Sequence, residues 1–284
     1  MTRIAVLLIL LFSVGINAEG QKKYELISYL KINVDSNGNL VKNPYVIDLH
    51  NKQKHLIVIG TQHSRDTSNN MFAVIEKIFY QLKPELIINE GGNLTKSFSS
   101  RNQAILKEGE LGLEKFLADN AGIKTLNGDM NDKLEFEELS KAYSKEEALL
   151  FFASERFILP YAFGQYSGDL EKVYDSIFIK KYLLKEGISL TAKERKFSFY
   201  TKLYKKYFHQ EFSLDNIDQF NFTPFRQQSR LNDVTRESKE IRDIALLETI
   251  EQQLKVHDTI LVIFGGWHVL AIEPALKQIV ERAN

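Results

Sequence analysis

The sequence predicts an α/β fold: a mostly parallel or mixed central sheet flanked by helices, with a largely helical insertion or cap. Three runs, KHLIVIG (54–60), ELIINE (85–90) and DTILVIFGG (258–266), are almost continuously apolar and rich in β-branched residues, which is typical of strands buried on both faces. Helical spacing of apolar residues follows these runs, as crossover connections between parallel strands require. From about 135 to 255 the pattern is almost entirely helical, and we interpret this segment as the cap.

Three weaker strands complete the expected sheet. The segments 24–34 and 44–50 alternate in hydrophobicity and are separated by the turn SNGN at 36–39, so we expect both to be strands. GIKTLNGD, at 122–129, is a further candidate strand that follows the helical pattern LGLEKFLADNAG.

Two helices are predicted with clear boundaries. The segment 69–82 carries one apolar stripe and begins at the capping residues Ser68 and Asn69, whose side chains accept hydrogen bonds from free backbone N–H groups. The last helix is expected over 272–283, with Pro274 in its first turn, where proline removes no helical hydrogen bond.

The first 18 residues are predicted to be a cleaved signal peptide, which leaves a single domain over 19–284. They comprise the basic Arg3, an apolar run from Ile4 to Ile16 and the small Ala18, which is the layout of a secretory signal. No later segment is apolar enough to span a membrane. We therefore expect a secreted or periplasmic protein, and the lack of cysteine favours a bacterial periplasm over a eukaryotic secretory route.

Composition excludes several functions. Lys plus Arg and Asp plus Glu both number 37, so the chain lacks the basic excess that nucleic-acid binding normally requires. There is no cysteine, which excludes a thiolate nucleophile and a cysteine-ligated zinc ion.

Polar residues follow each buried run at the point where a strand would end. They are His63 after the run at 54–60, Glu90 at the end of 85–90, Asp129 at the end of the candidate strand 122–129 and His268 after 258–266. Because parallel strands place their carboxyl ends at one edge of a sheet, these four side chains are expected to converge on one crevice. The alternative for each histidine is a structural, hydrogen-bonded side chain, and for Asp129 an ordinary Gly-Asp turn.

Two chemistries are open to this set. Two imidazoles with one or two carboxylates can hold a divalent ion such as Zn, Mn, Co or Fe, which would activate a water molecule. Without a metal, one histidine can act as general base with a carboxylate to orient it. Arg242 lies in an apolar helical stretch and therefore needs an anionic partner. In a structural role its partner would be Glu90 or Asp129. In a functional role it would bind a developing oxyanion or a substrate carboxylate.

These motifs together resemble the TraB/PrgY/Tiki superfamily, to which the erythromycin esterases and the ChaN-type haem-binding proteins are more distantly related. The resemblance rests on GTQH (60–63), NEGG (89–92), IRDIALLETI (241–250) and GGWHVLAIEPAL (265–276). It implies metal-dependent peptidase chemistry of the Tiki type, with His63, Glu90 and His268 as metal ligands and Arg242 in a supporting role.

We therefore expect an exported metal-dependent hydrolase, in the first place a peptidase, in which Asp129 is a further candidate ligand. The alternatives are a metal-independent, esterase-like hydrolase that uses a histidine as general base, and a haem- or metal-binding protein without turnover. A peptide or an ester is the expected substrate class.

Overall fold

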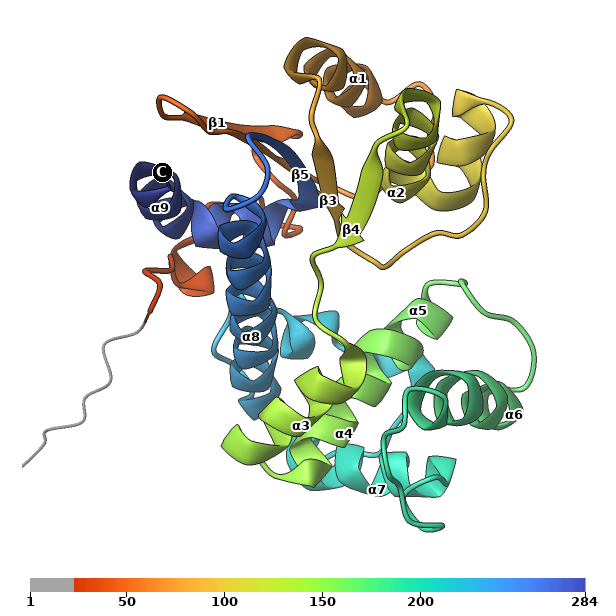
Figure 1. The fold of residues 1–284 in the computed structure, drawn as a ribbon. Coiled ribbons are helices and arrows are strands. Elements are labelled where there is room, and N and C mark those ends of the chain that lie inside the picture. Colours follow the sequence, from red (N-terminus) through yellow and green to blue (C-terminus); the bar gives the residue numbers. More distant parts are fainter. Residues whose placement is uncertain (1–22, 284) are drawn as a thin grey trace, which may run out of the picture.

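The computed structural model describes residues 23–283, so the predicted signal peptide at 1–18 lies outside the described residues. A central sheet carries helices on both faces, and a separate group of helices packs beyond one edge of it (Figure 1). The predicted α/β class, with a mixed, mostly parallel sheet and a helical insertion, is confirmed.

The sheet has five strands in the order β1-β2-β5-β3-β4. They are β1 (Tyr45–His50), β2 (His55–Thr61), β3 (Leu86–Asn89), β4 (Lys124–Asn127) and β5 (Thr259–Gly265). β1 is antiparallel to β2, whereas β2, β5, β3 and β4 are parallel to one another. The almost entirely apolar β2, β3 and β5 occupy the interior of the sheet, as expected for strands covered on both faces.

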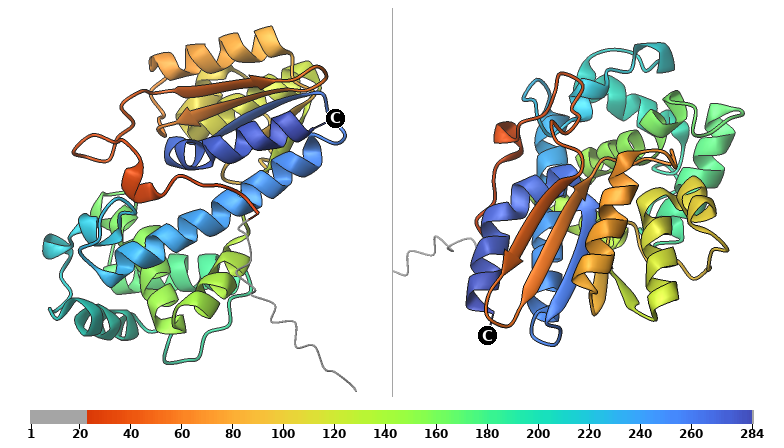
Figure 2. Two further views of the ribbon diagram at one scale, coloured as in Figure 1. Left: turned by 90° about the vertical axis from the view of Figure 1, so that its left-hand side faces the viewer. Right: turned by 90° about the horizontal axis from the view of Figure 1, so that it is seen from above.

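Helices cover the two faces of the sheet in pairs (Figure 2). α1 (Asn70–Leu82) and α2 (Arg101–Ala121) pack on the face that contains Ile57 and Ile59. α8 (Arg230–Gln253) and α9 (Gly266–Arg282) pack on the opposite face, which contains Leu56 and Val58. The alternation follows from the two-residue period of a strand.

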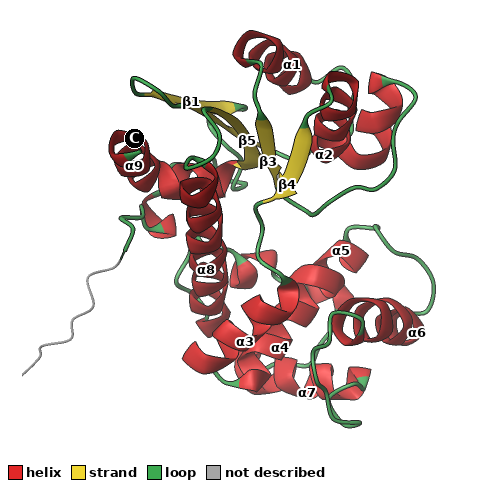
Figure 3. Cartoon of the chain, in the orientation of Figure 1, coloured by secondary structure: helices red, strands yellow, loops and turns green. Residues whose placement is uncertain are grey.

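The segment between β4 and β5 contains no strand among the residues that the structure describes (Figure 3). Besides α8, its helices include α3 (Asp132–Ala142), α4 (Lys145–Ala153), α5 (Leu159–Ala162), α6 (Leu170–Val173), α7 (Phe197–Phe208) and the π-helical stretches Ser154–Ile158 and Tyr174–Leu184. They pack with the first turn of α8 around their own aromatic core, which includes Phe157, Tyr174 and Tyr200. Burial of each such side chain contributes about 1.5–3 kcal/mol.

Two predicted elements are wrong. The segment 24–34 is not a strand: it contains a short 3-10 helix, Tyr29–Lys31, and an isolated bridge between Val34 and Leu40. Here the tertiary contact of the Tyr29 hydroxyl with Asp243 and His268 outweighs the local strand pattern.

The last helix begins earlier than predicted, at Gly266, and Pro274 therefore lies inside it rather than in its first turn. The chain turns directly from β5 into α9 because small residues let the elements approach. A Cβ on Gly60 would lie 2.9 Å from the Cα of Gly266, and a Cβ on Gly266 would lie 2.2 Å from Cδ1 of Leu40. No helix within residues 23–283 is long and apolar enough to cross a membrane.

Candidate functional site

The predicted site residues gather at the carboxyl edge of the sheet. His63 follows β2, Glu90 follows β3, Asp129 follows β4, and His268 lies in the first turn of α9 after β5. His63, Glu90, Asp129 and Arg242 line one pocket of about 860 Å³. His268 does not line it, and the residue is only 4% exposed.

Arg242 joins two of the predicted carboxylates. Its Nη2 lies 2.7 Å from Oε1 of Glu90, and its Nε and Nη2 each lie 2.7 Å from an oxygen of Asp129. The guanidinium comes from α8 and is 4% exposed, so these charge-assisted bonds form away from water. Both carboxylate oxygens of Asp129 are therefore already in contact with Arg242.

Glu90 is fixed as an anion between three groups. Its Oε2 accepts a 2.5 Å hydrogen bond from the backbone N–H of Gly265, in addition to the bond from Arg242. Burial acts to raise the pKa of Glu90, but the positive charges of Arg242 and His63 outweigh it and lower that pKa. The chain can turn away after Glu90 because Gly91 and Gly92 adopt φ of +95° and +101°, which favours glycine.

His63 forms a pair with Glu110, a residue that the sequence did not single out. Nδ1 of His63 hydrogen-bonds to Oε1 of Glu110 on α2. The imidazole is 71% exposed toward the pocket, whereas the Glu110 side chain is 11% exposed. The hydrogen bond to Glu110 raises the pKa of His63 to about 9, against the opposing effect of burial. At neutral pH, His63 is therefore a cation whose Nε2–H is free for a ligand.

A kink in α2 makes this pair possible. Glu108 and Gly109 have non-helical backbone angles, and Gly109 has a φ of +59°. A Cβ at Gly109 would lie 2.7 Å from the carbonyl oxygen of Ser64. Glycine therefore lets the loop that carries His63 rest directly against α2, which brings Glu110 within hydrogen-bonding distance.

His268 has the same kind of partner. Its Nδ1 lies 2.6 Å from Oδ1 of Asp243, and the Tyr29 hydroxyl donates to Oδ2 of Asp243 at 2.9 Å. Burial, reinforced by the charge of Arg242, lowers the pKa of His268 well below its ordinary value, so this imidazole is neutral. Burial raises the pKa of Asp243 well above its ordinary value. In the ionised form of Asp243, Nδ1 of His268 donates the hydrogen bond and Nε2 carries the free lone pair; in the protonated form, the carboxyl group donates to Nδ1 and Nε2 carries the proton.

Glu90 and the Cδ2 edge of the His268 ring both lie close to Gly265. A Cβ placed on Gly265 would lie 2.8 Å from Oε2 of Glu90 and 3.5 Å from Cδ2 of His268. Cδ2 neighbours Nε2 in the ring. His63 and His268 therefore each bind a carboxylate through Nδ1 and leave Nε2 for other chemistry.

The residues do not form a ready metal centre. Within residues 23–283, no three His, Asp or Glu side chains are grouped closely enough to hold a metal ion. Arg242 is already paired with both Glu90 and Asp129 and balances one of their two negative charges, and a divalent cation shared by these carboxylates would lie beside the guanidinium charge. The two free Nε2 atoms are nevertheless suitable metal donors by their chemistry.

Three partners of the histidines escaped sequence analysis: Glu110, Asp243 and Tyr29. The role of Asp243 could have been inferred from the sequence, because it adjoins Arg242 in the apolar helix and a second buried charge there needs a partner. The roles of Glu110 and Tyr29 could not have been inferred, because they depend on the kink in α2 and on the path of the segment before β1.

The fold and site together define an α/β protein with two histidine–carboxylate pairs at the carboxyl edge of its sheet. Comparison with known proteins adds no further assignment: no protein-family model matches the chain, and no curated protein sequence matches it.

Proposed function

We propose that this protein is an exported hydrolase that cleaves a peptide or ester bond in the pocket lined by His63, Glu90 and Arg242. The observation that carries the proposal is the pair of imidazoles, each with Nδ1 bound to a carboxylate and each in a different charge state. Environments that move the pKa values of two titratable groups in opposite directions supply an acid and a base at the same pH.

In this mechanism His63 is the general acid and His268 the general base. The cationic His63 faces the pocket and donates its Nε2 proton to the leaving group. The neutral His268, with Asp243 ionised, would accept a proton at its Nε2 from a water molecule that enters beside Gly265, because His268 itself does not line the pocket. Arg242 uses Nε and Nη2 for its carboxylate partners, and its Nη1 is left to stabilise a developing oxyanion.

A metal-dependent form is the second candidate, and one observation favours it. A carboxylate on Nδ1 is the arrangement that orients metal-ligating imidazoles in many proteins, and both histidines have it. Zn, Mn, Co or Fe would be held by His63, His268 and Glu90, with Asp129 as a further candidate, and would supply an activated water. Arg242 between the carboxylates favours the metal-free form.

One experiment separates the two forms. The purified mature chain is assayed against a panel of peptides and esters, with and without a strong chelator, and its metal content is measured beside His63→Ala and His268→Ala. Activity that survives chelation supports the acid–base form. Stoichiometric metal that both substitutions remove, with activity lost in chelator, supports the metal-dependent form.

Membership of the TraB/PrgY/Tiki superfamily and export to the periplasm are parts of the same proposal, and they rest on the sequence motifs and the N-terminal segment. A chain that hydrolyses nothing in the panel but gives a Soret band with haem, lost in His63→Ala, would instead favour a haem-binding protein.

A further inference from the structure

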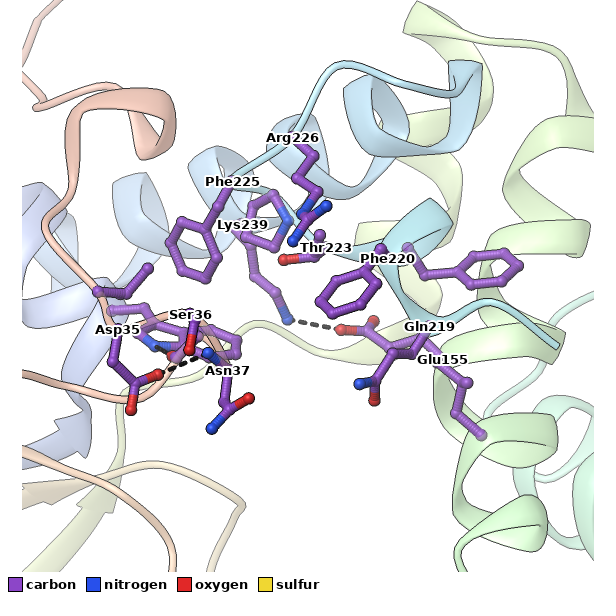
Figure 4. A pocket seen from close by; sticks show the side chains of 16 residues that line it. Asp35, Ser36, Asn37, Glu155, Gln219, Phe220, Thr223, Phe225, Arg226 and Lys239 are labelled. Atoms are coloured by element: carbon purple, nitrogen blue, oxygen red, sulfur yellow. Dashed lines mark hydrogen bonds and ion pairs between the residues drawn. The ribbon is translucent and has the colours of Figure 1, made fainter.

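A second pocket, of about 380 Å³, shares no lining residue with the pocket that contains His63, and lies between the turn at 34–38, the segment 219–226 and the start of α9 (Figure 4). Its size is within the range of small-molecule sites. Its walls combine aromatic rings with two cations and two carboxylates, contributed by Phe220, Phe225, Trp267, Arg226, Lys239, Glu155 and Asp35, and the Asp35 carboxylate already accepts hydrogen bonds from Asn37 and Asn39.

The aromatic wall is rigidly held. Trp267 directly precedes His268 in the sequence, and its indole Nε1 donates a 2.9 Å hydrogen bond to the carbonyl oxygen of Gly38. The ring of Phe225 meets the indole edge to face, with centroids 4.9 Å apart and an angle of 88° between planes. These contacts fix an apolar surface that can accept a ring or a branched side chain.

Arg226 provides a positive charge at the same pocket. Its guanidinium carbon lies 3.9 Å from the centroid of the Phe220 ring, and the residue is exposed. Among residues 23–283, the nearby Arg230 and Arg236 form ion pairs with acidic side chains, whereas Arg226 forms none. A guanidinium that is oriented by a ring and has no carboxylate partner is well suited to bind an anionic group.

Glu155 provides an acceptor. Its Oε1 binds Nζ of Lys239 at 2.7 Å, and this pair lies in the pocket near Phe220 and Phe225 (Figure 4). Its Oε2 is buried and accepts no hydrogen bond, and Nε of Arg156 is 3.8 Å away, beyond hydrogen-bonding distance. Burial acts to raise the pKa of Glu155, but Lys239 and Arg156 lower it to about 2, so the carboxylate is ionised. A ligand N–H would satisfy this oxygen once the side chains that cover it move aside.

We propose that this pocket binds the carboxyl-terminal residue of a peptide, or an N-acyl amino acid of the same chemistry, with an aromatic or large apolar side chain. The side chain would pack on Phe225 and Trp267, the free carboxylate would pair with Arg226, and the amide N–H would donate to Oε2 of Glu155. This combination of one anion, one donor and one apolar group matches the three kinds of wall that the pocket presents. The inference does not depend on the hydrolase proposal.

The chain carries a built-in probe, because Trp267 is its single tryptophan. Its fluorescence is titrated with N-acetyl-L-phenylalanine and with the neutral N-acetyl-L-phenylalaninamide, which lacks only the charge. We expect saturable changes, with the acid bound about two- to fivefold more tightly than the amide, because Arg226 is exposed and an ion pair with an exposed side chain is weak. In Arg226→Gln the difference between acid and amide should disappear.

Two further variants complete the experiment. Arg282→Gln removes an arginine at the far end of α9, outside this pocket, and should keep the preference for the acid. His63→Ala should also keep it, which separates binding here from chemistry in the other pocket. Equal affinities for acid and amide in the wild-type chain, no saturable change, or an Arg226→Gln chain that still prefers the acid would overturn the proposal.

Discussion

Arg242 and Glu90 are joined by a 2.7 Å ion pair at the carboxyl edge of the sheet, and the same guanidinium holds Asp129. Since Arg242 is 4% exposed, Arg242→Met leaves two carboxylates without a counter-charge. We expect this substitution to lower the free energy of unfolding by about 3–5 kcal/mol, the cost of breaking a buried pair. Urea denaturation at pH 7 measures it, and a loss below about 1 kcal/mol would show that the pair is not structural.

The raised pKa of His63 is predicted to depend on Glu110. NMR titration of the histidine ring protons should show one signal near pH 9 in the wild-type chain, absent from His63→Gln. In Glu110→Gln that pKa should fall toward about 6.5, the ordinary value for histidine. A signal that stays near 9 in Glu110→Gln would contradict the pair.

The raised pKa of His63 makes the stability of the folded chain depend on pH. Because the folded-state pKa of His63 lies above its unfolded value, its contribution is fully present below pH of about 6.5 and is lost as the pH rises through about 9. The stability advantage of wild type over Glu110→Gln should therefore shrink across this window. His63 is largely exposed, so solvent screening keeps the effect small. A stability difference between wild type and Glu110→Gln that grows as the pH rises would contradict this prediction.

Much of the fold could be predicted from local pattern, because β2, β3 and β5 are apolar on both faces and the glycines after them mark strand ends. The convergence of His63, Glu90, Asp129 and His268 on one edge followed from parallel topology alone. The partners of the histidines did not follow, since they depend on a helix kink at Gly109 and on an irregular path at Tyr29. Long-range contacts of this kind leave no period in the sequence.

Tyr29→Phe tests the buried support of His268. The hydroxyl donates to Asp243, which in turn binds Nδ1 of His268, and its loss leaves a buried acceptor unsatisfied. The expected cost is about 1–3 kcal/mol in the free energy of unfolding. Tyr80→Phe is the matched control, because Tyr80 is 62% exposed, and should change stability by less than about 0.5 kcal/mol. Equal effects of the two substitutions would argue against the Tyr29–Asp243–His268 arrangement.

Gly109→Ala tests the kink in α2. Gly109 and Gly122 both have positive φ, +59° and +67°, but only at Gly109 would an added Cβ lie within 3 Å of a neighbouring atom, the carbonyl oxygen of Ser64. Gly122→Ala should cost about 1 kcal/mol for backbone strain alone. Gly109→Ala should cost more and should also lower the pKa of His63, by NMR titration, because α2 is pushed away. Identical costs and an unchanged His63 pKa would show that the kink does not position Glu110.

The most direct test of the central claim is hydrolysis by the wild-type chain and by His63→Gln, measured as kcat/KM on any peptide or ester that the panel identifies, with His50→Gln as the control. His50 lies in β1, outside the pocket that contains His63. The acid–base account predicts that His63→Gln lowers kcat/KM by about 10²–10⁴-fold, the usual contribution of a general acid, while His50→Gln leaves it unchanged. Full activity in His63→Gln would contradict the account.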